Sequence, residues 1–211
     1  MALQNRVDPF GEIVAHPARG LFMGNRGGRI HTQGKQLSNR RWASHHWICC
    51  VTEFRGWRRE VMGEGYTELF FLDEATALAA GHRPCAFCRR GDFERFVEAW
   101  ARGAQVERPR SVDVIDRALH AERAGPGRQK AMFTAKLADL PAGTFVTFEE
   151  TPARAYLTWA GRLFPWSFEG YGEPIAGRPG LEALVLTPRS IVGALGAGYE
   201  PKVALPPGNT D

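Results

Sequence analysis

The features that this 211-residue chain lacks, or has few of, limit the classes of protein to which it can belong. It has no apolar run approaching the roughly 20 residues that a membrane-spanning helix needs, and its first residues lack the apolar core of a signal peptide. Only four cysteines are present, and without a targeting signal they indicate metal ligands or buried thiols rather than disulfides. We therefore expect a cytoplasmic protein with no membrane partner. The sequence leaves its oligomeric state open.

Lysine is also scarce. Only four of the 27 cationic residues are lysines, so arginine carries nearly all the positive charge of a chain with a pI of about 9.1. Arginine suits bidentate recognition of phosphates and base edges, and this bias favours a nucleic-acid partner. Genome base composition is the alternative explanation.

The hydrophobic patterns predict an α+β fold in three parts. Residues 1–44 form a Gly/Arg-rich N-terminal segment, 45–110 a small strand and helix module, and 111–211 a helix followed by a β-rich C-terminal lobe. In the module we expect strands within 45–56, 57–62 and 67–72, then a helix capped by Asp73 and ended by Gly81. Further helices are predicted over 92–102 and 111–123, with Ser111 as the cap of the latter.

Two segments permit two interpretations each. The glycine-rich stretch 20–31 is either a phosphate-cradling loop or a loop crossing the surface, and it matches no established phosphate-binding fingerprint. The dense aromatics of 156–171 either stack unpaired bases or fill the core of a small β-structure.

A Cys-x-x-Cys pair stands in a basic turn after the first predicted helix. The turn reads Gly81-His82-Arg83-Pro84-Cys85-Ala86-Phe87-Cys88-Arg89 and continues with Arg90. Two cysteines at this spacing are half of many zinc sites. Arg83, Arg89 and Arg90 surround the pair with positive charge, as a nucleic-acid contact requires.

This segment resembles the Ada-type zinc-binding domain, a DNA methylphosphotriester repair module. Phe70-Phe71 stands for the family's strand, Ala75 to Ala80 for its alanine-rich helix, and 81–89 for its Gly-x-Arg-Pro-Cys-x-x-Cys turn. The resemblance covers about 45–95, and the whole chain also resembles a bacterial family that carries this module. It implies an Ada-like fold, a zinc site and DNA binding.

The resemblance fails in its upstream half. The family's other two ligands form a Cys-x-x-x-Cys pair about thirty residues earlier, and one of them accepts the methyl group. The corresponding place, 57–62, holds no cysteine. The resemblance therefore argues against methyl transfer.

Other residues can complete a metal site. Cys49 and Cys50 are the nearest thiols, but neighbours on a strand point to opposite faces, so at most one readily joins Cys85 and Cys88. His82 lies inside the turn, and His31, His45 and His46 lie upstream. The sequence therefore permits a Cys3His or Cys2His2 zinc site. It also permits two alternatives: the metal has been lost and the four cysteines are buried thiols, or Cys85 and Cys88 form a redox-active pair.

A second constellation lies on the helix predicted over 111–123. Asp116 and His120 are four residues apart and share one face, and a carboxylate can orient a histidine that acts as a general base. An exposed ion pair is the alternative interpretation.

We conclude from the sequence that this is a metal-binding protein with an Ada-like module that binds nucleic acid. A hydrolase or nucleic-acid-modifying enzyme using Asp116 and His120 is the alternative, as is a metal-stabilised interaction module without nucleic acid.

Overall fold

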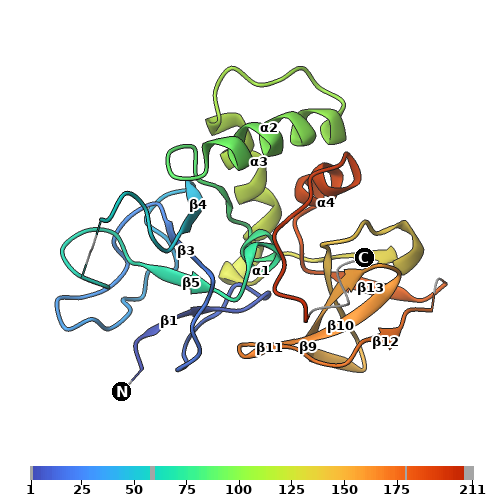
Figure 1. The fold of residues 1–211 in the computed structure, drawn as a ribbon, viewed down its shortest axis with the longest axis horizontal. Helices are drawn as coiled ribbons and strands as arrows, with labels where there is room; N and C mark the ends of the chain where they lie inside the picture. Colours follow the sequence, from blue (N-terminus) through green and yellow to red (C-terminus); the bar gives the residue numbers. More distant parts are fainter. Residues whose placement is uncertain (1, 58–59, 179, 207–211) are drawn as a thin grey trace.

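The computed structural model describes residues 2–57, 60–178 and 180–206. It confirms the α+β fold: two β-sheets lie on either side of a short central helix, and three further helices pack above them (Figure 1). Within the described residues no helix is long and apolar enough to cross a bilayer.

The first sheet has six strands in the order β2-β1-β5-β3-β4-β6. Their bounds are β1 Gln4–Val7, β2 Ile13–Ala15, β3 Phe22–Arg26, β4 Trp47–Val51, β5 Leu69–Phe71 and β6 Arg83–Pro84. β3 runs antiparallel to both β4 and β5, whereas β6 adds to the edge parallel to β4. Strands from 1–44 and from 45–110 therefore share one sheet, and the expected boundary at residue 44 does not separate two sheets.

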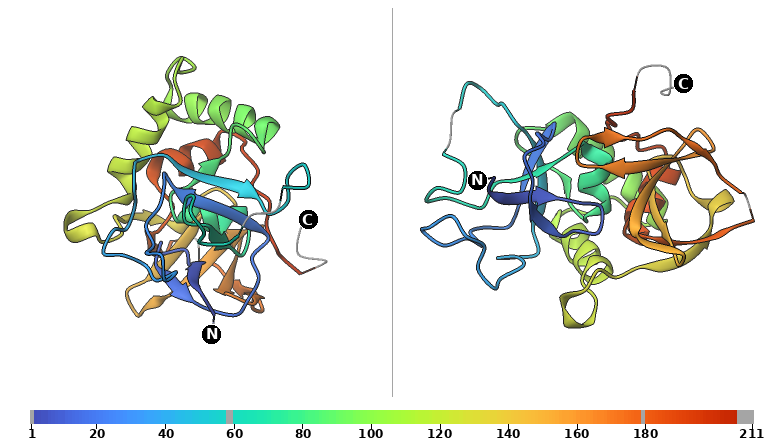
Figure 2. Two further views of the ribbon diagram at one scale, coloured as in Figure 1. Left: turned by 90° about the vertical axis from the view of Figure 1, so that its left-hand side faces the viewer. Right: turned by 90° about the horizontal axis from the view of Figure 1, so that it is seen from below.

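Helix α1, Glu74–Ala79, lies between the two sheets (Figure 2). All six of its residues are buried. Its alanines face both ways: Ala77 packs with the core of the first sheet, and Ala75 with the core of the C-terminal lobe. Small side chains are needed here because two sheets approach one helix.

The ends of α1 are the ones the sequence predicts. The Asp73 carboxylate accepts a hydrogen bond from the backbone N–H of Thr76 (2.8 Å), which caps the helix. Gly81 follows the helix at φ +87°, a conformation that favours glycine, and a Cβ there would lie 2.5 Å from Arg123.

Three amphipathic helices form the upper layer (Figure 1). They are α2 Arg90–Ala104, α3 Asp113–Arg123 and α4 Arg189–Gly196. A Cβ on Gly103 of α2 would lie 2.3 Å from the carbonyl oxygen of Gly193 in α4, so the two helices cross at backbone contact. α3 is predicted correctly except at its start, where Val112 rather than Ser111 is the N-cap residue.

The C-terminal lobe is a second sheet in the order β11-β10-β9-β8-β13-β7, with β12 paired to β10. The strands are β7 Phe133–Lys136, β8 Phe145–Phe148, β9 Thr151–Trp159, β10 Arg162–Ser167, β11 Gly170–Tyr171, β12 Ile175–Ala176 and β13 Glu182–Val185, with short 3-10 helices η1 Pro126–Arg128 and η2 Leu137–Asp139. Tyr156, Phe164 and Tyr171 are buried in its core. These three aromatics therefore follow the core interpretation rather than base stacking.

Two local expectations are corrected. The glycine-rich stretch 20–31 contains β3, a central strand whose Gly24 lies against Ile48 and Phe71, rather than only a loop. The strand expected over 57–62 is not formed by Trp57 or by residues 60–62, and residues 58–59 lie outside the described residues.

The Asp73 carboxylate also joins α1 to the C-terminal lobe. Its second oxygen accepts the Tyr171 hydroxyl (2.7 Å) and the backbone N–H of Ala204 (3.0 Å). Tyr171→Phe keeps the ring in the core and removes one hydrogen bond to a buried charge. We predict that it lowers the free energy of unfolding by about 1.5–3 kcal/mol, measured by urea denaturation. A loss below about 0.5 kcal/mol, the size of a surface effect, would contradict this link between the lobes.

Candidate metal centre

Strand β6 brings the Cys-x-x-Cys turn beside strand β4. The parallel register pairs Ile48 with Arg83 and Cys49 with Pro84, and the N–H of Cys85 donates to the carbonyl of Cys49 (2.9 Å). Because the chain then turns into α2, Cys85 and Cys88 both lie against the face of β4 that carries Cys50.

The sulfur atoms of Cys50, Cys85 and Cys88 form one cluster. All three lie within 4.8 Å of one another, and Cys85 Sγ accepts a hydrogen bond from the backbone N–H of Phe87 (3.4 Å). Hydrogen bonds with Cys50 and Cys88 lower the pKa of the Cys85 thiol, whereas hydrogen bonds with Cys85 and Cys88 raise that of the Cys50 thiol. Three convergent thiols near a backbone donor fit a zinc ion, which binds thiolates tetrahedrally.

Cys49 and His82 lie across the sheet from this cluster. Cys49 shares the Trp47 face of β4, and its Sγ lies 3.3 Å from a guanidinium nitrogen of Arg89. Burial raises the pKa of the Cys49 thiol, so it stays protonated. The His82 ring packs between Trp47 and Phe71. Of the five predicted ligands the structure brings three together and separates these two, as strand alternation requires.

Two of the three arginines predicted to contact nucleic acid are buried. Arg83 forms a bidentate pair with Asp116 (2.8 and 2.7 Å), and Arg89 pairs with Glu74 and Asp92 (2.7 Å each). The turn is enclosed by α1, α2 and α3, whose carboxylates face it, so these two guanidiniums are directed inward. Arg90 alone is exposed.

The predicted Asp116 and His120 pair does not form. Asp116 is fully buried, and besides Arg83 its carboxylate accepts a hydrogen bond from His46 Nδ1 (2.8 Å). His120 packs edge-on against Trp42 and lies 3.3 Å from Arg123. Burial and the Arg123 charge lower the pKa of His120. Asp116 therefore holds Arg83 and His46 in place.

A cluster of three titratable side chains, His45, His46 and Asp113, lies at the surface beside Asp116. His45 Nε2 contacts Asp113 Oδ1 (2.6 Å), and His46 Nε2 lies 3.9 Å from the same oxygen. The histidine contact lowers the pKa of Asp113. The sequence interpretation omitted Asp113, because nothing local links it to histidines 67 and 68 residues earlier.

The cysteine cluster opens into an apolar pocket of about 350 Å³. Its lining includes the three cysteines and side chains from β3, β4, β5 and the following loops: Met23, Asn25, Ile48, Val51, Thr52, Phe54, Trp57, Val61, Tyr66, Glu68, Phe70 and Phe87. The buried Glu68 carboxylate accepts the N–H of Met62 (2.7 Å). One wall of the pocket is thus made of three thiols.

Three aromatic rings gather at this pocket. Phe54 lies 5.2 Å from Phe87 and 6.1 Å from Trp57, centroid to centroid, and the Arg55 guanidinium lies 5.1 Å from the Phe54 ring. Trp57 and Phe87 are both more than half exposed. Sequence reasoning missed this cluster, although two large aromatics in a polar, glycine-containing stretch were the available signal.

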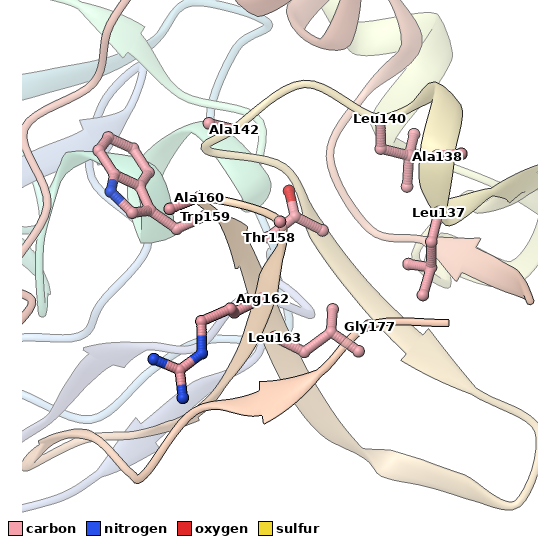
Figure 3. Close-up of a pocket in the computed structure, with 11 residues that line it drawn as sticks. Leu137, Ala138, Leu140, Ala142, Thr158, Trp159, Ala160, Arg162, Leu163 and Gly177 are labelled. Atoms are coloured by element: carbon pink, nitrogen blue, oxygen red, sulfur yellow. The ribbon is translucent and has the colours of Figure 1, made fainter. Parts of the chain in front are cut away.

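The C-terminal lobe has its own cavity of about 230 Å³. It is formed by the β9–β10 hairpin and the 137–142 segment, with Trp159 and Arg162 on one side (Figure 3). Its lining is mostly apolar and contains no carboxylate, histidine or cysteine. The metal-ligating chemistry lies elsewhere.

Comparisons with known proteins give no match: no family model fits the chain, and neither a curated protein nor a solved structure is significantly similar to it.

The Asp116 geometry predicts a structural effect. Asp116→Ala leaves the buried Arg83 without its partner, and we expect it to lower the free energy of unfolding by about 3–5 kcal/mol. Urea denaturation measures the loss, and Asp139→Ala, an exposed acidic residue, is the matched control with an effect within about 0.5 kcal/mol. An Asp116→Ala protein as stable as the control would refute the positioning role.

Proposed function

We propose that this protein binds zinc through Cys50, Cys85 and Cys88 and keeps one coordination position open toward the aromatic pocket, where it binds single-stranded nucleic acid, DNA in the first instance. The observation that carries the proposal is the convergence of three sulfurs from β4 and the turn within 4.8 Å of one another. Reduced thiolates are required, which favours a cytoplasmic protein.

The open position follows from the donor set. Closed structural zinc sites have four protein ligands, whereas sites that act on a substrate keep three and leave the fourth position to water or substrate. Within the described residues, no fourth histidine, cysteine or carboxylate joins this cluster. When bound, zinc would supply a Lewis acid at the wall of the pocket.

The pocket suits an unstacked base. Aromatic side chains stack bases of single strands without reading their sequence, and Trp57 and Phe87 present exposed rings beside the cysteines. Arg55 and the exposed Arg90 supply positive charge for the backbone. The Ada-like turn supports the same partner, while the missing methyl-accepting cysteine argues against methyl transfer.

The hydrolase alternative has less support. Asp116 is occupied by Arg83 and His46 and does not contact His120. A metal-stabilised interaction module without nucleic acid remains the outcome if the DNA-binding experiment below fails while zinc is retained.

We predict about one zinc ion per chain, measured by plasma mass spectrometry on untagged protein purified without added metal. Cys50→Ser and the double variant Cys85→Ser/Cys88→Ser should lose it, because each removes thiolate ligands. Cys49→Ala, a neighbouring buried thiol outside the cluster, should retain it. Zinc content that does not depend on Cys50 would disprove the ligand set.

Cobalt substitution tests the open position of the same site. Added imidazole should shift the visible d–d bands of the Co²⁺ protein, since it can occupy a vacant or water-filled position. An unchanged spectrum at saturating imidazole would mean a closed site.

We also predict that the exposed rings of Trp57 and Phe87 bind single-stranded DNA by stacking on its bases. Trp57→Ala and Phe87→Ala should each weaken the affinity for a fluorescently labelled single-stranded oligonucleotide by about 5- to 100-fold, because stacking contributes about 1–3 kcal/mol per base. Ile175→Ala, an exposed apolar residue of β12, is the control. Affinity should fall with salt. Equal affinities for all three variants and the unmodified protein would remove the DNA-binding part of the proposal and leave the zinc site standing.

A further inference from the structure

A group of cations gathers on the opposite face of the first sheet from the cysteine cluster. Arg26 ends β3, Arg123 ends α3, and Lys130 follows η1. All three line one narrow cavity together with Trp47. The Arg26 and Arg123 guanidinium carbons lie 4.1 and 4.0 Å from the centre of the Trp47 ring.

Arg26 and Arg123 are 1% and 3% exposed, and Lys130 is partly buried. Their hydrogen bonds go mainly to backbone carbonyls: Arg26 to Gly11 (2.7 Å) and Arg41 (3.4 Å), Arg123 to Gly81 (2.6 Å) and His45 (2.7 Å), and Lys130 to Ala79. Arg123 also contacts the neutral ring nitrogen Nδ1 of His120 (3.3 Å). Neutral carbonyls accept these hydrogen bonds but do not cancel the charge.

No carboxylate lies in direct contact with the group. Within the described residues none of the three cations forms an ion pair, and Glu12, which lines the same cavity, is paired with Arg41 (2.5 Å). Carboxylates act on the group only from a distance: Asp8 and Glu12 on Arg26, Asp8 on Lys130, and Asp116 on Arg123. The Nε atoms of Arg26 and Arg123 are buried without a hydrogen-bond partner, as are both ring nitrogens of the adjacent His82. Two donors therefore remain unused in a site of concentrated positive charge.

Such an arrangement is costly without an anion. Burying an unpaired charge costs several kcal/mol, and a buried unsatisfied donor about 1–3 kcal/mol. Burial lowers the pKa of Arg26 and of Arg123 to about 9, and burial together with these two arginines lowers that of Lys130 to about 7. An anion between them would reverse each of these effects.

We propose that the cavity bounded by Arg26, Arg123 and Lys130 binds a phosphate group, either inorganic phosphate or the terminal phosphate of a nucleotide or nucleic-acid end. Arginine forks and a lysine ammonium are the side chains that bind phosphate in proteins. The burial of Arg26 excludes a continuous phosphodiester backbone, which cannot enter a closed cavity.

Entry requires a local opening. The cavity holds about 20 Å³, which is room for about one water molecule. Glu12 and Arg41 are partly exposed and line it, so a phosphate group is admitted when their ion pair opens. The Glu12 carboxylate then competes with the bound anion, so removing its charge should strengthen phosphate binding.

Calorimetric titration with inorganic phosphate, at constant ionic strength set with chloride, tests the site. Unmodified protein should bind phosphate, and the Lys130→Met variant should bind it at least about tenfold more weakly, a loss of about 1.4 kcal/mol. Lys136 is an exposed lysine of β7, and the control variant Lys136→Met should bind phosphate as the unmodified protein does. Glu12→Gln should bind about 2- to 5-fold more tightly, because it removes the competing carboxylate.

Thermal unfolding gives an independent readout. Phosphate near saturation should raise the Tm by about 5 °C more than chloride does, since a ligand that binds only the folded state stabilises it. Lys130→Met should lose this increment. If that variant does not fold, Arg41→Met at the edge of the cavity provides the same comparison.

Two results would overturn the proposal: no phosphate-specific binding by the unmodified protein, or equal binding by the Lys130→Met and Lys136→Met variants. A 5′-phosphorylated oligonucleotide compared with its unphosphorylated form distinguishes a nucleic-acid end from free phosphate. Because this cavity lies across the sheet from the cysteines, its outcome does not depend on zinc or on the Trp57 surface.

Discussion

Buried pairs between arginines of the Cys-x-x-Cys turn and distant carboxylates are the constraint on which the rest of the structure depends. Arg83 meets Asp116 of α3, and Arg89 meets Glu74 at the start of α1. Glu74 in turn accepts the Tyr199 hydroxyl (2.5 Å), so the same ionic core reaches the C-terminal segment. Once such charges leave water, each needs its partner, and the elements that carry them are fixed together.

This constraint places the cysteines. The turn cannot rotate while Arg83 and Arg89 are held, and β6 remains in register with β4, so Cys85 and Cys88 meet Cys50. The arginines that make the turn look like a phosphate-binding surface are therefore used inside the protein. The exposed surface beside the cysteine cluster is aromatic instead, and for this reason the contact we propose with nucleic acid is base stacking rather than phosphate neutralisation.

Strand β4 separates two different chemistries. Ile48 and Cys50 face the apolar pocket, whereas Trp47 and Cys49 face the opposite side, where Arg26 and Arg123 stack on the indole. A five-residue strand thus carries a soft, thiol-rich site on one face and a cationic site on the other. The alternation of side chains keeps them apart although they share adjacent residues.

The sequence by itself determined the local features. The α+β class, the Asp73 and Gly81 ends of α1, the amphipathic helices α2 and α3, and the restriction that only one of Cys49 and Cys50 could join the turn all follow from periodicity and capping, which act over a few residues. The cap of α3 and the strand expected at Trp57 and residues 60–62 were misjudged because such short signals compete with tertiary contacts.

Only the tertiary structure decided the partners. It selected Cys50 rather than Cys49 through the register of β4 and β6, gave Asp116 to Arg83 and His46 rather than to His120, and assembled Arg26, Arg123 and Lys130 from three separate segments. The two Asp116 pairings and the meeting of Cys50 with the turn join residues 33 or more positions apart. Their physical reason is the burial of charge in a shared interior, and no local pattern of side chains records which distant group will be there to neutralise it.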